Sequence, residues 1–519
     1  MHGFVPFPAE RAAAYRAAGY WQGRPLVSLL DDAAARWPDR AAVIDPTSTL
    51  SYAELDIAAE KAAAGLHRLG VTPGDRVLLQ LPNGCPFAIT LFGLLRLGAI
   101  PVLCLPGHRA AEIGHLAAVS DAVGIVIPDA TAGFDYSAMV SELGLRRLII
   151  DETTDRPAPR FTPDPATPAV LLVSGGTTGL PKLIPRTHND YVYNATASAA
   201  LCGLTADDVY LVALPAAHNF PLACPGFLGA ISVGATTVFG TDPSPEAAFA
   251  TIARHRVTVT ALVPALATLW AQACDWEPQK PTTLRLLQVG GAKLAAADAR
   301  RIREVLTPGL QQVFGMAEGL LCYTRPGDSA EVLDTTQGRP LCADDEVRVV
   351  DEDGAEASEG ELMVRGPYTI NGYYNATEAN ERSFSPEGFY RSGDRVRRLP
   401  NGYLEVTGRI KDVIVRGGEN IAADELETHL LSHPAIRSAA AVGLPDQYLG
   451  EKVCAAVVFN GAPLTLAELN SHLAQGGVAT HVRVDQLAPL PALPTTAVGK
   501  IDKKALARLV GGGQTHLTG

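Results

Sequence analysis

The sequence lacks a surplus of basic residues. Its 519 residues include 43 Lys and Arg against 55 Asp and Glu, a formal net charge of −12. A surface that binds nucleic acid presents basic side chains to the phosphates, so this composition argues against a nucleic-acid partner. Paired cysteines are lacking too, because the eight cysteines stand singly with no CxxC motif and no histidine cluster. Neither a zinc site nor a disulfide framework is expected.

The chain has little that looks like a targeting or membrane segment. Met1–Glu10 does not have the basic start and apolar core of a signal peptide. The most apolar stretch, Phe87–Gly107, is interrupted by Arg96, Gly98 and Pro101. This pattern predicts a buried helix followed by a strand rather than a membrane span. We therefore expect a cytoplasmic protein that has no membrane partner.

Core-forming sequence, by contrast, is plentiful. Hydrophobic residues make up 47% of the chain and charged residues 19%. That is an ordinary globular balance in a chain long enough for two or more folding units. Short apolar runs alternate with helical stretches such as Ala53–Leu69, which is typical of layered α/β folds. The runs are Arg76–Leu81, Val123–Pro128, Leu211–Leu214, Val257–Leu262 and Leu284–Val289.

The segment Val173–Lys182 is rich in glycine and hydroxyl groups and directly follows an apolar run. Glycines let a backbone approach an anion closely and expose its N–H groups, while hydroxyls and a lysine add donors and charge. Such a segment can wrap phosphates, and a Gly-rich surface turn is the other interpretation that stays open. It lacks the GxxxxGK[ST] order of a Walker A loop, which disfavours an ordinary P-loop NTPase.

Continued by Leu183–His188, this segment resembles the phosphate loop of the adenylate-forming superfamily, which includes acyl-CoA synthetases and nonribosomal adenylation domains. The extended form resembles the stand-alone aryl acid adenylating enzymes most closely. Further motifs agree in order and spacing, and the likeness covers residues 1–510. These motifs are Pro215–Leu222, Gln288–Lys293, Val313–Glu318, Tyr390–Asp394, Gly408–Asp412 and Gly499–Lys503.

The resemblance implies an α/β fold with a large N-terminal domain of layered α/β subdomains, residues 1–409, and a small α+β C-terminal domain, residues 410–519. The small domain is expected to rotate about a hinge at Lys411 between two half-reactions. In the first, ATP and Mg²⁺ convert an aryl carboxylic acid into an acyl-adenylate with release of pyrophosphate. In the second, the acyl group passes to the phosphopantetheine thiol of a separate carrier protein, in siderophore or nonribosomal peptide biosynthesis.

At the nucleotide, Glu318 takes the place of the family's Mg²⁺ ligand, and Asp394 that of the carboxylate that accepts both ribose hydroxyls. Lys500 matches the lysine that offsets the repulsion when a carboxylate attacks the α-phosphate. Lys500 and Glu318 are therefore the predicted catalytic residues, whereas Lys503 and Lys504 are expected to be solvated. The other ATP-binding residues implied are Ser174, Gly175, Gly176, Thr177, Thr178, Gly179, Lys182, Gly291, Ala292, Val313, Phe314, Gly315, Met316 and Arg409.

The resemblance also implies an acid pocket. Asn219 replaces the aspartate with which amino-acid-activating relatives hold an α-ammonium, so an uncharged ring is expected. Cys224 and Leu321 stand where enzymes for 2,3-dihydroxybenzoate tend to carry serine and valine, which favours salicylate because both fill the space of a 3-hydroxyl. The predicted substrate-binding residues are His218, Asn219, Phe220, Cys224, Gly290 and Leu321.

Other readings stay open at this point. An aryl-CoA ligase would share the first half-reaction, and the acid could be 2,3-dihydroxybenzoate or a heteroaryl acid such as hydroxypicolinate or hydroxyquinaldate. A catalytically silent binding protein and a P-loop kinase or ATPase are alternatives from other classes. The segment Gly477–Asp485 departs from the Tyr-Lys-Ile-Pro-Asp-like pattern of relatives, which puts the usual carrier-docking residues of the C-terminal domain in doubt.

Overall fold

The structure of the chain is a computed structural model. It describes residues 1–128, 133–150, 158, 161–174, 181–410, 413–416, 419–446, 449–475, 482–496 and 499–511. The chain forms two compact units, the first of Met1–Val347 and Val364–Arg391 and the second of Arg348–Met363 and Ser392–Gly519. The predicted boundary between residues 409 and 410 is the position of a hinge. A division by packing does not test a hinge, so this boundary stays a prediction.

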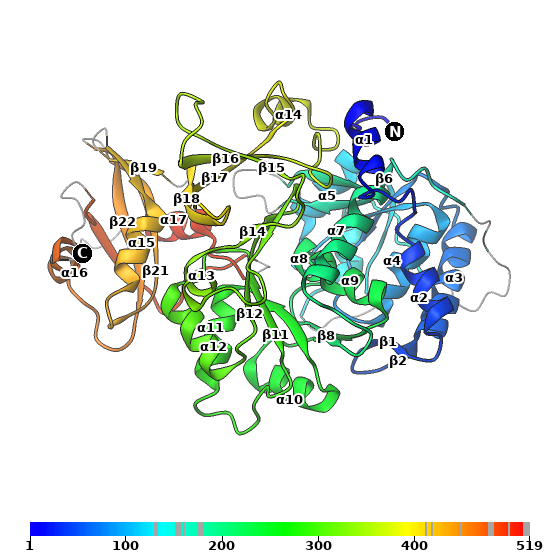
Figure 1. The fold of residues 1–519 in the computed structure, drawn as a ribbon, viewed down its shortest axis with the longest axis horizontal. Helices are drawn as coiled ribbons and strands as arrows, with labels where there is room; N and C mark the ends of the chain where they lie inside the picture. Colours follow the sequence, from blue (N-terminus) through cyan, green and yellow to red (C-terminus); the bar gives the residue numbers. More distant parts are fainter. Residues whose placement is uncertain are drawn as a thin grey trace. The chain divides into compact units, whose positions relative to one another are not determined.

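Within the described part of the first unit, nine strands form a mostly parallel sheet (Figure 1). Only the pairings β12–β13, β13–β14 and β1–β2 are antiparallel. In spatial order the strands are β14 (Arg339–Pro340), β13 (Gly319–Tyr323), β12 (Leu310–Met316), β11 (Leu286–Gly290), β10 (Val259–Leu262), β8 (Val209–Val212), β9 (Thr236–Phe239), β1 (Ala41–Ile44) and β2 (Thr49–Ser51).

A second sheet of the first unit carries the Gly-rich segment. Its order is β5 (Ala122–Val126), β3 (Arg76–Leu79), β4 (Ile100–Leu103), β6 (Pro168–Val173) and β7 (Leu183–Thr187). Strands β6 and β7 are antiparallel, and Val173 pairs with Leu183. The segment Ser174–Lys182 therefore joins two paired strands, so its ends are fixed by the sheet.

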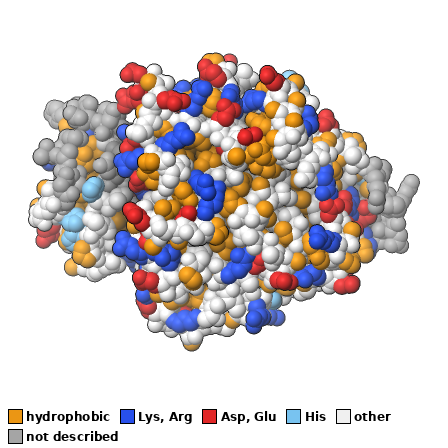
Figure 2. Space-filling model, in the orientation of Figure 1, with side chains coloured by type: hydrophobic (Ala, Val, Ile, Leu, Met, Phe, Trp, Pro, Cys, Tyr) orange, Lys and Arg blue, Asp and Glu red, His pale blue; other side chains and the backbone are white. Residues whose placement is uncertain are grey.

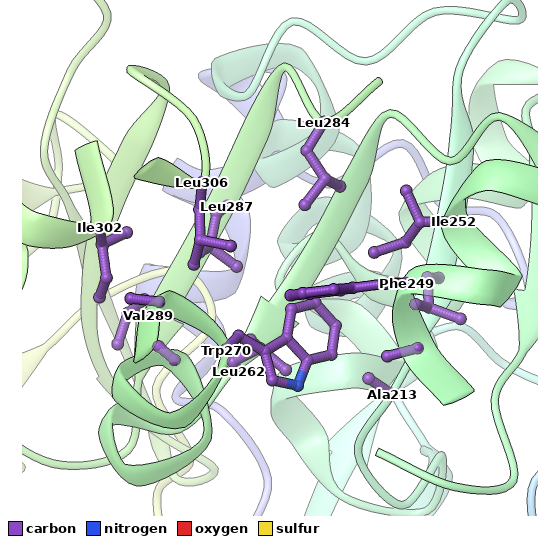
Figure 3. Packing of buried hydrophobic residues seen from close by; sticks show 14 of the residues in the cluster. Ala213, Phe249, Ile252, Leu262, Trp270, Leu284, Leu287, Val289, Ile302 and Leu306 are labelled. Carbon is purple, nitrogen blue, oxygen red and sulfur yellow. The ribbon is translucent and has the colours of Figure 1, made fainter. Parts of the chain in front are cut away.

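Helices cover both sheets of the first unit. They are α1 (Ala9–Ala17), α2 (Ser28–Arg36), α3 (Tyr52–Arg68), α4 (Cys85–Leu97), α5 (Ala110–Ser120), α6 (Tyr136–Glu142), α7 (His188–Leu201), α8 (Asn219–Ala223), α9 (Gly226–Val233), α10 (Pro245–His255), α11 (Pro264–Ala273), α12 (Ala296–Val305), α13 (Ala330–Thr335) and α14 (Thr377–Ser383). Figure 3 shows Phe249 of α10 and Trp270 of α11 packed among Leu262, Leu287 and Val289 of the large sheet. Such apolar layering holds sheet and helices together.

The described part of the second unit contains two further sheets with mostly antiparallel pairings. One four-stranded sheet runs in the order β15 (Glu346–Val350), β16 (Glu359–Arg365), β17 (Tyr390–Arg398) and β18 (Leu404–Arg409). Another consists of β20 (Glu419–Ala422), β19 (Val413–Arg416), β22 (Gly450–Phe459) and β21 (Ile436–Asp446), with β23 (Gln486–Pro489) pairing β22. The helices α15 (Ala423–Leu431), α16 (Leu466–Gln475) and α17 (Lys503–Gly511) contribute to its two hydrophobic clusters.

The elements agree with the predicted α/β class. Ala53–Leu69 was expected to be helical and forms α3, which begins with a capping box between Ser51 and Glu54. The apolar stretch Phe87–Gly107 contains all but the first two residues of the buried helix α4, followed by β4, as predicted. Among the described residues no helix is long and apolar enough to cross a membrane. Acidic and basic side chains are interspersed on the face drawn in Figure 2, so that face carries no broad field of one sign.

Candidate active site

Glu318, the predicted magnesium ligand, lies in the turn between β12 and β13 and is buried. Its Oε1 accepts a hydrogen bond of 2.7 Å from the hydroxyl of Tyr373, which also lies 3.0 Å from the hydroxyl of Tyr390. The main-chain oxygen of Glu318 accepts from the N–H of Ile370 at 2.8 Å. Both ends of this residue are therefore fixed, and the carboxylate has a defined orientation.

Lys182, the predicted phosphate-loop cation, lies near the same tyrosine. Its Nζ is 3.9 Å from the centroid of the Tyr373 ring, within the range of a cation–π contact. The main chain of Lys182 is tied to Ser174, because its N–H donates to Ser174 Oγ and its oxygen accepts from Ser174 N–H, both at 2.9 Å. The other predicted loop residues, Gly175, Gly176, Thr177, Thr178 and Gly179, lie outside the described residues.

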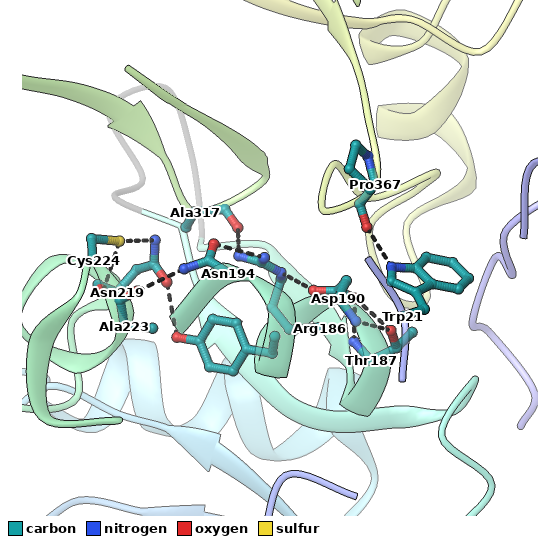
Figure 4. Close-up of polar contacts among 11 residues, drawn as sticks. Trp21, Arg186, Thr187, Asp190, Asn194, Asn219, Ala223, Cys224, Ala317 and Pro367 are labelled. Carbon is teal, nitrogen blue, oxygen red and sulfur yellow. Dashed lines mark hydrogen bonds and ion pairs between the residues drawn. The ribbon is translucent and has the colours of Figure 1, made fainter. Parts of the chain in front are cut away.

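The predicted acid pocket is centred on Asn219, at the start of α8 and buried. Its Oδ1 accepts from the hydroxyl of Tyr191 at 2.8 Å, and its Nδ2 donates to Cys224 Sγ at 3.5 Å (Figure 4). His218 caps this short helix through Nδ1, which accepts from the N–H of Phe220 at 3.3 Å. Burial raises the pKa of Cys224 to about 12, so its thiol stays neutral and is no nucleophile.

The structure also brings together the remaining residues of the predicted acid pocket. The ring of Phe220 lies against Gly290 at the end of β11, where a Cβ would come within 3.1 Å of Phe220 Cζ. Leu321 of β13 pairs with Gly315 of β12, where a Cβ would meet Leu321 Cδ2 at 2.5 Å. Glycine at both positions thus leaves room for a flat aromatic wall and for the leucine side chain.

Residues predicted to bind the nucleotide occupy the same strand ends. Val313, Phe314, Gly315 and Met316 form the last part of β12, and Gly315 is exposed. After β11 the chain turns at Gly291, whose φ of +90° favours glycine, and both Gly291 and Ala292 are exposed. The backbone at Gly291, Ala292 and Gly315 is therefore accessible, which is what contact with the flat ring of a nucleotide base would require.

A buried ion pair lies behind these residues. Arg186, fully buried, donates from Nε to Asp190 Oδ1 at 2.8 Å and from a terminal nitrogen to the main-chain oxygen of Ala317 at 3.1 Å. It also donates to Asn194 Oδ1 at 3.1 Å, and Asn194 donates in turn to the oxygen of Ala223 at 2.6 Å. Figure 4 shows this network joining the residue before Glu318 to the acid-site helix.

The main chain of Leu321 is linked to a buried acid. Its N–H donates to the Tyr368 hydroxyl at 3.1 Å, and this hydroxyl donates to Asp345 Oδ2 at 2.6 Å. The other oxygen, Oδ1, is buried without a hydrogen-bond partner in the described part of the chain. Burial raises the pKa of Asp345 to about 7, against the smaller opposing effect of the hydrogen bonds.

We expect Asp345 to make the free energy of unfolding depend on pH. Because the pKa of Asp345 is raised, its contribution to the free energy of unfolding is present at low pH and is lost as pH rises through about 7. Between about pH 6 and about pH 8, the free energy of unfolding of Asp345→Asn is expected to fall by roughly 1 kcal/mol less than that of the wild-type protein. Urea unfolding at both pH values measures this difference, and equal losses in the two proteins would contradict it.

In the second unit, Asp394 and Arg409 lie side by side. They are register partners on β17 and β18, and Arg409 Nε donates to Asp394 Oδ1 at 2.8 Å. Asp394 is buried, and its main-chain N–H donates to Ser392 Oγ at 3.0 Å. The structure thus brings together the two residues predicted at the ribose, whose role there stays a prediction. The hinge residue Lys411 lies outside the described residues.

Lys500 lies in a turn closed by its own main chain. Its N–H donates to Thr496 Oγ1 at 3.2 Å, and its oxygen accepts from Thr496 N–H at 2.7 Å. Lys504 is exposed as expected. The expectation for Lys503 is wrong, because its Nζ lies 2.9 Å from Glu427 and 3.3 Å from Asp424 of α15, where two carboxylates compensate the charge.

Comparison with known proteins decides the family. The model of the AMP-binding enzyme family matches residues 30–374, and that of the AMP-binding enzyme C-terminal domain matches residues 425–500. The chain belongs to the AMP-binding enzyme family. The alternative of a P-loop kinase or ATPase is therefore wrong, whereas the predicted adenylating enzyme is confirmed.

Individual relatives of this AMP-binding enzyme are close. The salicyl-AMP ligase / salicyl-S-ArCP synthetase of Mycobacterium tuberculosis is 66% identical over 98% of this chain and 95% of the relative. A 2,3-dihydroxybenzoate-AMP ligase of Bacillus subtilis is 44% identical over 98% of both chains. The apo structure of Mycobacterium smegmatis MbtA is 65% identical, covers 98% of both chains and has a TM-score of 0.76. These relatives confirm the resemblance to stand-alone aryl acid adenylating enzymes and the predicted fold.

The donor set of this AMP-binding enzyme fits a magnesium ion that arrives with ATP. Among the described residues no group of three or more His, Cys, Asp or Glu could hold a metal by itself. Magnesium is often bound through one or two carboxylates together with substrate phosphates. The buried, oriented carboxylate of Glu318 fits this kind of site, and Mg²⁺ held there would neutralise part of the triphosphate charge.

Sequence reasoning missed several residues of this site. Tyr373 bonds Glu318 across 55 positions, and Arg186 bonds Ala317 across 131 positions, so neither contact leaves a local pattern. A signal was available for Arg186, which stands within the extended motif Leu183–His188. The consecutive pair Tyr373-Tyr374 was a weaker signal for Tyr373.

Proposed function

We propose that this enzyme uses ATP and Mg²⁺ to convert salicylate into salicyl-adenylate, releasing pyrophosphate, and then transfers the salicyl group to the phosphopantetheine thiol of a separate carrier protein. The relative from M. tuberculosis, 66% identical over 98% of the chain, supports this by its name. The acceptor belongs to a siderophore or related peptide pathway in this proposal. An aryl-CoA ligase would differ only in the thiol.

Within this proposal the predicted nucleotide residues keep their roles. Glu318 holds Mg²⁺, Lys182 and the Gly-rich loop hold the phosphates, and Asp394 with Arg409 holds the ribose. Lys500 approaches the carboxylate and the α-phosphate, where its ammonium offsets the repulsion between two anions. Rotation of residues 410–519 about Lys411 then removes Lys500 and admits the thiol.

The observation that carries the choice of acid is the contact between Asn219 and Cys224. Because Tyr191 occupies Asn219 Oδ1, the amide group of Asn219 offers N–H donors, which suit an acceptor on the acid. One of them points to Cys224 Sγ, a large and weak acceptor. A 3-hydroxyl on the ring would lie next to this sulfur, which is larger than oxygen and a weaker hydrogen-bond partner. Salicylate, which has no 3-hydroxyl, is therefore favoured over 2,3-dihydroxybenzoate.

Salicylate-dependent ATP–pyrophosphate exchange tests the proposal. A panel of salicylate, 2,3-dihydroxybenzoate, benzoate and 3-hydroxypicolinate should give the largest kcat/KM for salicylate. Thioester formation with a carrier protein and with free CoA then separates the two acceptors. Exchange with a heteroaryl acid alone would keep the enzyme class and reject the acid, and no exchange with any acid would favour a catalytically silent binding protein.

Cys224→Ser is expected to shift the preference toward 2,3-dihydroxybenzoate by about tenfold in the ratio of kcat/KM values, because a hydroxyl is smaller and bonds more strongly than a thiol. The same exchange assay measures the ratio. Cys104→Ser is the matched control, since it places the same hydroxyl at another fully buried cysteine, directly after β4. An equal shift in both variants, or in neither, would reject Cys224 as a selecting residue.

A further inference from the structure

Tyr373 lies where the predicted magnesium and phosphate residues meet. It belongs to the loop between β16 and α14, and its side chain is 1% exposed. Its hydroxyl donates to Glu318 Oε1 at 2.7 Å, and its ring lies 3.9 Å from Lys182 Nζ. One side chain thus contacts the carboxylate through its hydroxyl and the cation through its face.

The position of Tyr373 is set by the protein itself. Its N–H donates to Asn380 Oδ1 at 2.7 Å, and its oxygen accepts from Asn380 Nδ2 at 3.0 Å. The next residue, Tyr374, donates its N–H to the main-chain oxygen of Leu183 at 2.9 Å, and Leu183 directly follows Lys182 in the sequence. Because these contacts involve no substrate, the tyrosine is held in place before ATP binds.

The hydroxyl of Tyr373 donates to Glu318 Oε1 and lies 3.0 Å from the Tyr390 hydroxyl, so it is held from two sides. A protonated hydroxyl that donates to one carboxylate oxygen fixes the rotamer of that carboxylate, as outer contacts do for metal ligands in general. The ring face, in turn, attracts the ammonium of Lys182.

We propose that Tyr373 is a positioning residue for Mg–ATP, whose hydroxyl orients Glu318 for the metal and whose ring aims Lys182 at the phosphates. The inference rests on the proposed roles of Glu318 and Lys182. It does not depend on which acid is activated, because ATP and Mg²⁺ bind without the acid in the test below. Tyr373 itself touches neither reacting atom.

Tyr373→Phe separates the two contacts, since it removes the hydroxyl and keeps the ring below Lys182. The readout is the affinity for ATP measured by calorimetry with and without Mg²⁺, in the absence of acid. The factor by which Mg²⁺ strengthens ATP binding is expected to fall about tenfold in Tyr373→Phe, the usual cost of losing an outer contact to a metal ligand. Affinity for ATP without Mg²⁺ should stay within about twofold of the wild-type value.

Tyr52→Phe is the matched control. Tyr52 is also fully buried, and its hydroxyl donates a hydrogen bond of 2.6 Å to the oxygen of Ala235. Tyr52→Phe therefore also removes a hydrogen-bonded buried hydroxyl, but one without contact to Glu318 or Lys182, whereas Tyr373→Phe removes the contacts to Glu318 and Tyr390. A merely structural role of Tyr373 predicts equal effects on Mg²⁺ dependence in the two variants, and that result would overturn the proposal, as would a Tyr373→Phe variant with the wild-type dependence.

Tyr373→Leu adds a second arm, because it removes the ring as well as the hydroxyl. Its affinity for ATP without Mg²⁺ should fall below that of Tyr373→Phe, since Lys182 loses its aromatic partner. Equal affinities in the two variants would reject the part of the proposal that concerns Lys182. Failure of every acid to support pyrophosphate exchange would reject the proposed acid chemistry and leave these binding results standing.

Discussion

Lys500→Ala is expected to lower the rate of acyl-adenylate formation about a hundred- to a thousandfold, while thioester formation from added salicyl-adenylate stays close to the wild-type rate. The physical reason is that the attacking carboxylate and the α-phosphate repel each other. A placed ammonium stabilises the transition state in which they meet, and removal of one such group typically costs this factor. Thiol attack on the finished adenylate does not bring the same two anions together.

The structure gives this experiment a control nearby in the chain. Lys504 is exposed, so Lys504→Ala should leave both half-reactions unchanged. The turn around Lys500 is closed by main-chain groups and by Thr496, so the alanine variant keeps these contacts. Pyrophosphate exchange measures the first step and thioester formation from synthetic adenylate the second. Equal losses in both steps would contradict a role confined to adenylation.

The sequence predicts the elements of this fold well where the pattern is local. The run Arg76–Leu81 contains β3, and Val257–Leu262 contains β10. The run Leu211–Leu214 overlaps its strand only in part, because β8 spans Val209–Val212. The oxygen of Val212 still accepts from the main-chain N–H of Gly240 at 3.0 Å, whereas beyond the strand end the oxygen of Leu214 accepts from the side-chain amide of Asn83 at 3.0 Å. No periodicity reveals such a partner.

The candidate site divides in the same way. Glu318, Asn219 and Asp394 stand in contiguous motifs, so their positions could be identified from the sequence. Tyr373 could not, because its function depends on a contact 55 positions away. Lys503 was wrongly expected to be solvated, because nothing in the sequence around it indicates that Glu427 lies beside it in the fold. Long-range partners of charged side chains are therefore the part that sequence alone leaves undetermined.

Arg186→Met is expected to lower the free energy of unfolding by about 3–5 kcal/mol, because it leaves the buried carboxylate of Asp190 without its counter-charge. Burial raises the pKa of Asp190, and Arg186 is the main group that opposes this effect. The variant should therefore bind a proton at Asp190 on folding, and its loss of stability should shrink at low pH. Chemical denaturation near pH 5 and pH 8 measures both effects.

The double variant Arg186→Met with Asp190→Asn shows which part of the cost is electrostatic. If the uncompensated charge dominates, the double variant should recover about half of the lost stability or more, because no buried charge remains. Both variants lack the Arg186 donors to Ala317 and Asn194, so the loss of these hydrogen bonds accounts for the stability that the double variant does not recover. A double variant no more stable than the single one would mean that these hydrogen bonds, which tie the turn of Glu318 to the acid-site helix, are what Arg186 contributes.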